Sequence, residues 1–302
     1  MTIARCQQIS LDHTRYYHCI SRCVRRAFLC GRDHYSGRDF GHRRQWLENR
    51  MAKLASVFAV DLLAYAIMSN HYHVVLRINR DEAAAWSDEE VVERWGQLFR
   101  VPDAVTSSEV VNVWRSRLFS ISWFMRALNE PLARWANKED ECCGRFWEGR
   151  FKLQALLDDT ALLRCMAYVD LNPIRAGIAN TPEASHHTSV YARVHRRDQH
   201  LLPLQHTYEA SSPLALSREE YLALVDWSGR ALRTDKQGAI PNALAPIFQR
   251  LNFKTKHWLA DMRHYGHWYY RAVGSLQALN DYRYHLGQRW LKGTGAVRIA
   301  AA

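Results

Sequence analysis

The chain has 302 residues and carries 41 Lys and Arg against 30 Asp and Glu, which gives a formal net charge of +11. Its 48% hydrophobic and 24% charged residues are typical of a globular protein and exclude disorder as the main state. The longest apolar stretch, 54–68, is interrupted by Asp61, and residues 1–10 hold no apolar core, so we expect neither a membrane span nor a signal peptide.

The cysteine and aromatic content of the chain indicates the compartment and the kind of partner. The seven cysteines form no Cys-x-x-Cys pair, which favours reduced, buried thiols and a cytoplasmic protein over a disulfide scaffold or a zinc site. The 11 Trp and 14 Tyr accompany an excess of positive charge. Cations hold phosphates and aromatic rings stack on unpaired bases, so this composition favours a nucleic-acid partner.

Hydrophobic periodicity predicts alternating strands and helices over the first 180 residues. In chain order we expect a strand at 16–22, a helix at 42–58, a hairpin at 61–78, a helical insertion at 81–117, a helix at 119–137, a strand at 145–156 and a helix at 160–171. This order indicates the α+β class and a ferredoxin-like antiparallel sheet. We expect residues 1–180 to form the catalytic domain, 181–212 a linker and 213–302 a mainly helical, basic and aromatic extension.

Two histidines on the second strand of the expected hairpin form a candidate metal site. Side chains alternate between the faces of a strand, so Tyr72 faces the core while His71 and His73 share the opposite face, roughly 6–7 Å apart. Two neutral imidazoles in this position can hold one divalent ion.

The expected helix at 160–171 carries the candidate nucleophile. Arg164, Tyr168 and Asn172 recur at four-residue intervals and therefore share one helix face, which Arg175 extends. Asn172 offers a third oxygen ligand to a hard cation such as Mg²⁺ or Mn²⁺. A metal that polarises a phosphate oxygen, with nearby guanidinium groups favouring the phenolate, would let Tyr168 attack a phosphodiester.

Four segments, in this order along the chain, resemble the single-tyrosine HUH transposases, above all the REP-associated tyrosine transposases. The segments are YYHCISR (16–22), MSNHYHVVL (68–76), RFWEGRFK (145–152) and AYVDLNPIRAGI (167–178). The resemblance covers residues 12–180. By position, His71 and His73 match the metal-binding pair, Tyr168 matches the nucleophile and Asn172 matches the polar residue one turn later.

The resemblance implies a Mg²⁺- or Mn²⁺-dependent enzyme that cleaves single-stranded DNA beside a hairpin. It further implies a covalent 5′-phosphotyrosine intermediate, a free 3′-OH that permits rejoining, and a possible homodimer in the bacterial cytosol or nucleoid. No membrane partner is expected.

Basic residues outside the two motifs are candidate DNA contacts, because cations bind phosphates irrespective of base sequence. Together with the two arginines near the nucleophile, the candidates are Arg22, Arg25, Arg26, Arg164, Arg175, Lys254, Lys256 and Arg271. For Glu148 we expect a salt bridge at the strand edge.

Two alternatives to a transposase remain open. The first is a non-enzymatic nucleic-acid-binding protein on the same type of sheet, which would need no metal. The second is an HUH replication initiator or relaxase, which shares the chemistry but acts at an origin.

Overall fold

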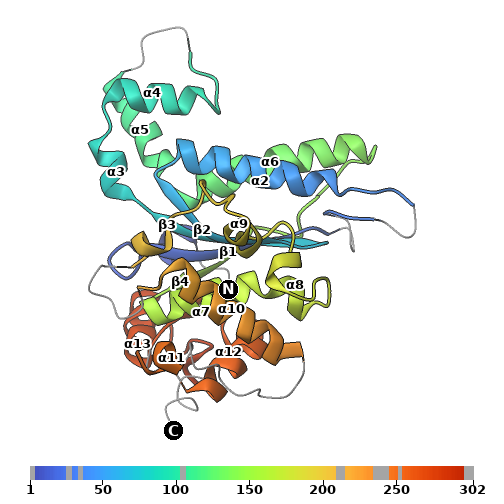
Figure 1. Cartoon of the computed structure of the whole chain (residues 1–302). Coiled ribbons are helices and arrows are strands. Elements are labelled where there is room, and N and C mark those ends of the chain that lie inside the picture. Colours follow the sequence, from blue (N-terminus) through green and yellow to red (C-terminus); the bar gives the residue numbers. More distant parts are fainter. Residues whose placement is uncertain are drawn as a thin grey trace.

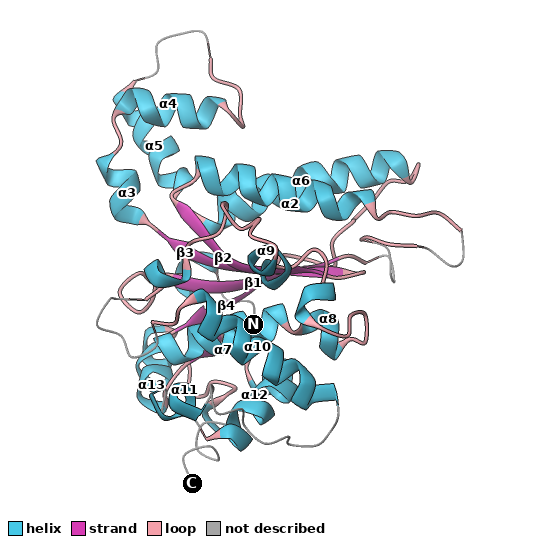
Figure 2. Cartoon of the chain, in the orientation of Figure 1, coloured by secondary structure: helices cyan, strands magenta, loops and turns pink. Residues whose placement is uncertain are grey.

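The sheet is the centre of the molecule, and helices cover both of its faces (Figures 1 and 2). The structure is a computed structural model that describes residues 4–24, 29–32, 37–102, 107–208, 215–233, 245–250 and 254–295. It is of the α+β class, as the sequence predicts. In the described part no helix is both long and apolar enough to cross a lipid bilayer.

Five strands form the sheet in the order β2-β3-β1-β4-β5. Their bounds are β1 Tyr16–Arg22, β2 Val60–Ile67, β3 His71–Ile78, β4 Lys152–Leu156 and β5 Ala272–Val273. Strand β1 is antiparallel to both β3 and β4, β2 is antiparallel to β3, and β5 is parallel to β4. The predicted hairpin is therefore confirmed.

The strand expected at 145–156 is shorter than predicted. Trp147 forms only an isolated bridge with Cys23, and its indole Nε1 donates to the carbonyl of Asn129 at 3.0 Å. These contacts keep the residues before Lys152 out of the strand ladder, so β4 begins at Lys152. The preceding residues instead form a loop beside the sheet.

Helices α2 (His42–Val57) and α6 (Ile121–Glu139) cover one face of the sheet (Figure 1). Their apolar residues pack in one cluster with every second residue of β3, beginning at Tyr72. The Tyr72 hydroxyl donates to Asn129 Oδ1 of α6 at 2.6 Å. The predicted alternation of β3 is thereby confirmed, since Tyr72 lies on this face and Val75 belongs to the cluster on the other.

The predicted insertion is helical and extends from one end of this helical layer (Figure 1). It comprises α3 (Arg80–Ala85), α4 (Asp88–Gly96) and α5 (Ser108–Leu118). Trp95 of α4 stacks on Trp114 of α5, with ring centroids 5.4 Å apart. Aromatic stacking thus joins the two longer helices of the insertion.

The remaining helices are α7 Asp159–Asp170, α8 Asn172–Arg175, α9 Ser189–Val194, α10 Arg218–Arg233, α11 Ala245–Arg250, α12 Thr255–Trp268 and α13 Leu276–His285, and the short α1 is Arg5–Gln8. Of these, α7, α10 and α12 share the cluster on the opposite face, whereas Leu279 and Tyr282 of α13 belong to the cluster of α2 and α6. Asp158 caps α7, as its Oδ1 accepts from the Ala161 amide at 2.8 Å.

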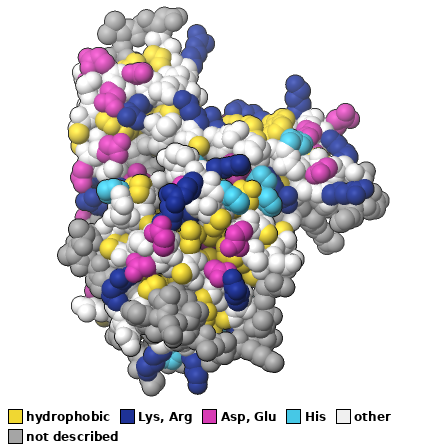
Figure 3. Space-filling model, viewed as in Figure 1, with side chains coloured by type: hydrophobic (Ala, Val, Ile, Leu, Met, Phe, Trp, Pro, Cys, Tyr) yellow, Lys and Arg dark blue, Asp and Glu magenta, His cyan; other side chains and the backbone are white. Residues whose placement is uncertain are grey.

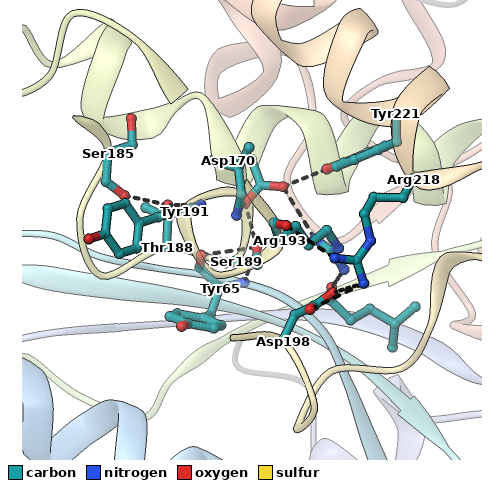
Figure 4. Close-up of polar contacts among 12 residues, drawn as sticks. Tyr65, Asp170, Ser185, Thr188, Ser189, Tyr191, Arg193, Asp198, Arg218 and Tyr221 are labelled. Atoms are coloured by element: carbon teal, nitrogen blue, oxygen red, sulfur yellow. Dashed lines mark hydrogen bonds and ion pairs between the residues drawn. The ribbon is translucent and has the colours of Figure 1, made fainter. Parts of the chain in front are cut away.

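The segment 181–212, expected as a linker, is packed structure throughout its described part, 181–208. It contains two 3₁₀ turns, Pro182–Ala184 and Leu204–His206, and the helix α9. Its polar residues bond to buried Asp170, which accepts from the Ser189 hydroxyl and from the Val190 amide (Figure 4). The segment is polar because its polar groups form hydrogen bonds with a buried carboxylate, and not because it is a linker.

The C-terminal region is not a separate unit behind a linker. Residues of α10 and α12 share one buried cluster with α7, and the Tyr221 hydroxyl of α10 donates to Asp170 Oδ2 at 2.6 Å. The expected boundary near residue 212 therefore does not divide the hydrophobic core.

Candidate functional site

The histidine pair lies at the start of β3, a strand flanked on both sides in the sheet. The ring centroids of His71 and His73 are 4.9 Å apart. His71 is half-buried, whereas His73 is 3% exposed. The two side chains share a face, as predicted from strand alternation.

Tyr168 of α7 lies directly over this face. The centroid of its ring is 5.9 Å from that of His73 and 6.4 Å from that of His18. Its side chain is 8% exposed. The candidate nucleophile and the candidate metal ligands therefore meet within one chain.

The exposed part of this arrangement is a pocket of about 180 Å³. Its lining combines the histidine pair and Tyr168 with three cations and one carboxylate: Ile20, Arg22, His71, His73, Glu148, Gly149, Arg150, Lys152 and Tyr168. Arg22 and Glu148 form a long ion pair at 3.7 Å, and both are about half exposed. The pocket thus offers positive charge beside a phenol, which suits a phosphate group.

Sequence analysis missed Arg150 and Lys152, because their place depends on strand register. In the sheet Ile20 pairs with His73 on one side and with Lys152 on the other. This register brings Lys152 to the histidine face from a segment some 80 positions away in the sequence. Sequence analysis assigns this segment a strand, a resemblance and a salt bridge for Glu148, but no contact with the histidines.

A second missed residue, His18, lies behind His73. His18 Nε2 and His73 Nδ1 are 2.9 Å apart, and His18 Nδ1 lies 3.1 Å from Gln154 Oε1. Tyr265 of α12 donates its hydroxyl to the same Gln154 oxygen at 2.9 Å. These four side chains form a buried row that we call the histidine relay: His73, His18, Gln154 and Tyr265.

The relay fixes where the protons are. An amide oxygen only accepts, so His18 carries its proton on Nδ1 and accepts at Nε2 from His73 Nδ1. His73 is therefore left with a lone pair on Nε2, an atom that is buried and has no hydrogen-bond partner in the described part of the chain. His71 Nδ1 lies 2.5 Å from Asn70 Oδ1, which leaves its Nε2 with a lone pair by the same reasoning.

Burial also keeps all three imidazoles neutral. Desolvation lowers the pKa of His18 and of His71 to about 4, and it lowers the pKa of His73 well below its ordinary value. The nearby cations Arg22 and Lys152 lower the pKa of His71 further. Neutral imidazoles with fixed tautomers are suitable ligands for a divalent metal ion.

The residues present fit a metal held by two protein ligands. Within the described ranges, no group of three His, Cys, Asp or Glu side chains is placed to hold an ion. The Asn172 amide, expected as a third ligand, donates from Nδ2 to the carbonyl of Tyr168 at 3.0 Å, and Asn172 is not among the residues that line the pocket. Its role as a ligand stays a prediction.

The other candidate DNA contacts are dispersed. Arg164 pairs with the buried carboxylate of Asp261 at 3.0 Å, so it supports α12 instead of facing the pocket. Arg175 lies over the Tyr168 ring, with Cζ 4.6 Å from the centroid, and donates to the Arg263 carbonyl. Arg25 and Arg26 lie outside the described residues. Lys254 and Lys256 are exposed near the start of α12, and Arg271 lines a different cleft.

Helix α12 forms the inner wall of the site, a role that sequence analysis did not assign to it. The Tyr265 ring stacks on Tyr168 with centroids 4.4 Å apart. A Cβ atom at Gly266 would lie 3.2 Å from the Tyr168 hydroxyl. Tyr265 thus contacts the candidate nucleophile through its ring and the histidine relay through its hydroxyl.

Comparison with known proteins gives little further information. No protein-family model and no curated protein sequence matches the chain. A solved structure of a REP-associated tyrosine transposase bound to a REP hairpin is similar with a TM-score of 0.38 and 12% identity, over 66% of this chain and 88% of that chain. Since a similarity this weak carries no functional weight, we base the function on the side chains of the site.

Proposed function

We propose that the chain is a DNA strand transferase of the single-tyrosine HUH type, which cuts and rejoins single-stranded DNA beside a hairpin. The observation that carries the proposal is the placement of the Tyr168 phenol over two neutral imidazoles, in a pocket with three cations. The order β1-α2-β2-β3-α6-β4, with β1 between β3 and β4, supports the ferredoxin-like arrangement expected for that type.

The residues of the pocket have separate roles in the reaction. Arg22, Arg150 and Lys152 bind the scissile phosphate and its neighbours. The Tyr168 oxygen forms a bond to phosphorus while the bond from phosphorus to the 3′ oxygen breaks. The phenol gives up its proton and the departing oxygen gains one, leaving a 5′-phosphotyrosine and a free 3′-OH.

Rejoining is the reverse step. The 3′-OH attacks the phosphotyrosine and restores Tyr168, so that no external energy is needed. Mg²⁺ or Mn²⁺ bound to Nε2 of His71 and of His73 would supply Lewis-acid polarisation of a non-bridging phosphate oxygen. The relay keeps the proton of His73 on Nδ1, so Nε2 carries the lone pair that a metal ion would need.

A homodimer in the bacterial cytoplasm remains part of the prediction. The site does not depend on one, because Tyr168 and the histidine pair meet in a single chain.

The test is covalent capture of DNA by the full chain. Single-stranded hairpin oligonucleotides are incubated with the protein and Mn²⁺, and adducts are resolved on a denaturing gel and located by mass spectrometry. We expect an adduct on Tyr168 that Tyr168→Phe abolishes and EDTA prevents, with binding retained. The matched control Tyr282→Phe, which removes a hydroxyl bonded to the Gln8 carbonyl outside the pocket lining, should form the adduct normally.

Two results would contradict the proposal. If Tyr168→Phe cleaves at the wild-type rate, Tyr168 is not the nucleophile. Binding that EDTA leaves unchanged, with no adduct under any condition, would favour the non-enzymatic nucleic-acid-binding protein instead.

A further inference from the structure

A second cleft, of about 410 Å³, lies between the turn that leads into β5 and the segment that follows α13. It is lined by Tyr270, Arg271, Gln288, Arg289, Trp290, Leu291 and Lys292. The described residues of the lining include three cations and no acidic side chain. Elsewhere, on the face in Figure 3, acidic and basic side chains are interleaved, so the cleft differs from that surface in its charge.

The cleft also exposes aromatic surface to an unusual degree. Trp290 is 67% exposed and Tyr270 is 56% exposed. The only other large aromatic side chain exposed in the described part is Tyr284, at 73%, which lies outside the lining. A large aromatic ring that stays in water does not stabilise the fold, so exposed rings beside cations are typical of an interaction site.

The fold holds these side chains in place. Leu291, next to Trp290, is 2% exposed and anchors the segment in the core. Arg283 Nη1 donates to the carbonyl of Arg289 at 3.0 Å. Gly293 has φ +119°, and a Cβ there would lie 2.9 Å from the Tyr269 ring, so only glycine allows this approach. The cleft is therefore a built feature.

The cleft is adjacent to the catalytic pocket. Strands β4 and β5 are parallel, with Ala155 beside Ala272, and the Ala155 amide donates to the Arg271 carbonyl at 2.8 Å. Parallel strands run in the same direction, so the turn at 270–271 lies beside residues 153–154. The residue before these, Lys152, lines the catalytic pocket.

Arg5 lies beside the segment that contributes to the catalytic pocket. Its guanidinium lies over the Phe151 ring, 4.3 Å from the centroid, and Phe151 stands between the lining residues Arg150 and Lys152.

We propose that this cleft binds unpaired nucleotides of a DNA strand that continues from the catalytic pocket, with bases stacked on Trp290 and Tyr270 and phosphates held by Arg289, Lys292 and Arg271. Stacking rings flanked by cations are the chemistry by which single strands are bound without sequence preference. This inference rests on the proposed function, which supplies both the DNA strand and its place in the catalytic pocket.

The test measures binding of fluorescein-labelled oligo-dT by fluorescence anisotropy. It uses the full chain carrying Tyr168→Phe, in EDTA, so that neither covalent capture nor metal contributes. Stacking contributes about 1–3 kcal/mol per base, so Trp290→Ala should raise Kd by about 5- to 150-fold. Trp290→Phe should retain most of the affinity, and the control Val113→Ala, which removes an exposed apolar side chain of α5, should bind like the parent.

Salt dependence tests the cations separately. Replacing Arg289 and Lys292 together by alanine should flatten the plot of log K against log salt by about 0.7 for each phosphate that the protein no longer neutralises. A blunt duplex of the same length should compete poorly with oligo-dT, because its bases are not available for stacking.

Several results would overturn the inference. It fails if Trp290→Ala binds oligo-dT like the parent, or if the duplex competes equally. It also fails if Trp290→Ala changes only the sedimentation of the protein, because the cleft would then contact a second copy or another protein. Failure here with normal adduct formation on Tyr168 leaves the proposed function intact. If Trp290→Ala weakens binding but the unmutated chain forms no adduct under any condition, the inference about the cleft stands and the proposed function is wrong.

Discussion

At the scale of single side chains, the candidate metal ligand His73 depends on a residue that does not line the pocket. His73 can present Nε2 only while its Nδ1 proton is bonded to His18, and His18 is in turn oriented by Gln154. A buried, neutral imidazole without such a partner would exchange between tautomers. The relay therefore pre-organises the ligand before any metal arrives.

We predict that His18→Phe weakens Mn²⁺ binding by about 10- to 100-fold, the usual effect of losing a partner that orients a ligand. Binding is measured by electron paramagnetic resonance of free Mn²⁺, without DNA. In the metal-free wild-type protein, nitrogen NMR should show His73 protonated on Nδ1. His200→Phe, which alters a partly buried histidine elsewhere, is the control. A wild-type His73 protonated on Nε2 would contradict the relay.

Stability of the metal-free protein should fall in mild acid. The pKa of His18 is about 4 in the fold, because of burial, and 6.5 in the unfolded chain. The unfolded state then binds more protons between these values, so the free energy of unfolding rises from pH 4 to pH 6.5 and is constant above. Urea titrations across this range measure the slope, which His18→Gln should reduce. An unchanged slope in that variant would argue against a neutral, buried His18.

At the scale of helices and strands, the elements that periodicity predicts are those whose burial is decided locally. The helices α2, α6 and α7 and the β2–β3 hairpin are predicted by apolar spacing, by the Asp158 cap of α7 and by turn residues. Strand alternation likewise placed His71 and His73 together. Local pattern contains no record of register, so it predicted neither Lys152 beside Ile20 nor His18 behind His73.

Polar segments are the other kind of element that sequence analysis misjudged. Residues 181–208 contain few apolar residues, yet α9 is held by the buried carboxylate of Asp170, which also pairs with Arg193 at 3.5 Å and bonds to Tyr221 (Figure 4). A sequence does not show which polar side chains will be buried together. The polar composition of the segment therefore predicts a linker, although the segment is packed.

Asp170→Ala should destabilise the fold by about 3–5 kcal/mol, because it leaves the guanidinium of Arg193 buried without its carboxylate. Urea unfolding followed by circular dichroism measures the loss. Asp226→Ala, which breaks an exposed pair with Arg230 within α10, should cost at most about 1 kcal/mol. If Asp170→Ala does not fold, Tyr221→Phe provides the smaller change, of about 1 kcal/mol. Equal effects of Asp170→Ala and Asp226→Ala would show that the network contributes nothing.

At the scale of the whole molecule, the packed unit that contains the candidate site extends beyond the residues that carry the motifs. The motif-bearing part ends near residue 180, but α10 and α12 complete the cluster that buries α7. Tyr265 of α12 stacks on Tyr168 and Trp258 of the same helix is 1% exposed. Without these helices α7 would expose apolar side chains to water, and Tyr168 would lose the Tyr265 ring that stacks on it.

A chain ending at residue 212 should therefore fail to form a stable site, although it keeps His71, His73 and Tyr168. Removing α10 and α12 takes away the Tyr265 ring that stacks on Tyr168 and the Gly229 backbone that lies against Leu171 and Ile174, and each large apolar side chain left exposed costs about 1.5–3 kcal/mol. Three such losses together are comparable with the roughly 5–15 kcal/mol that usually separates folded from unfolded states. Near-ultraviolet circular dichroism and soluble yield measure the outcome, and a chain ending at Gly295, which keeps every described helix, is the control. A soluble 1–212 fragment with cooperative unfolding and normal Mn²⁺ binding would show instead that the first 180 residues and the segment after them form an independent domain.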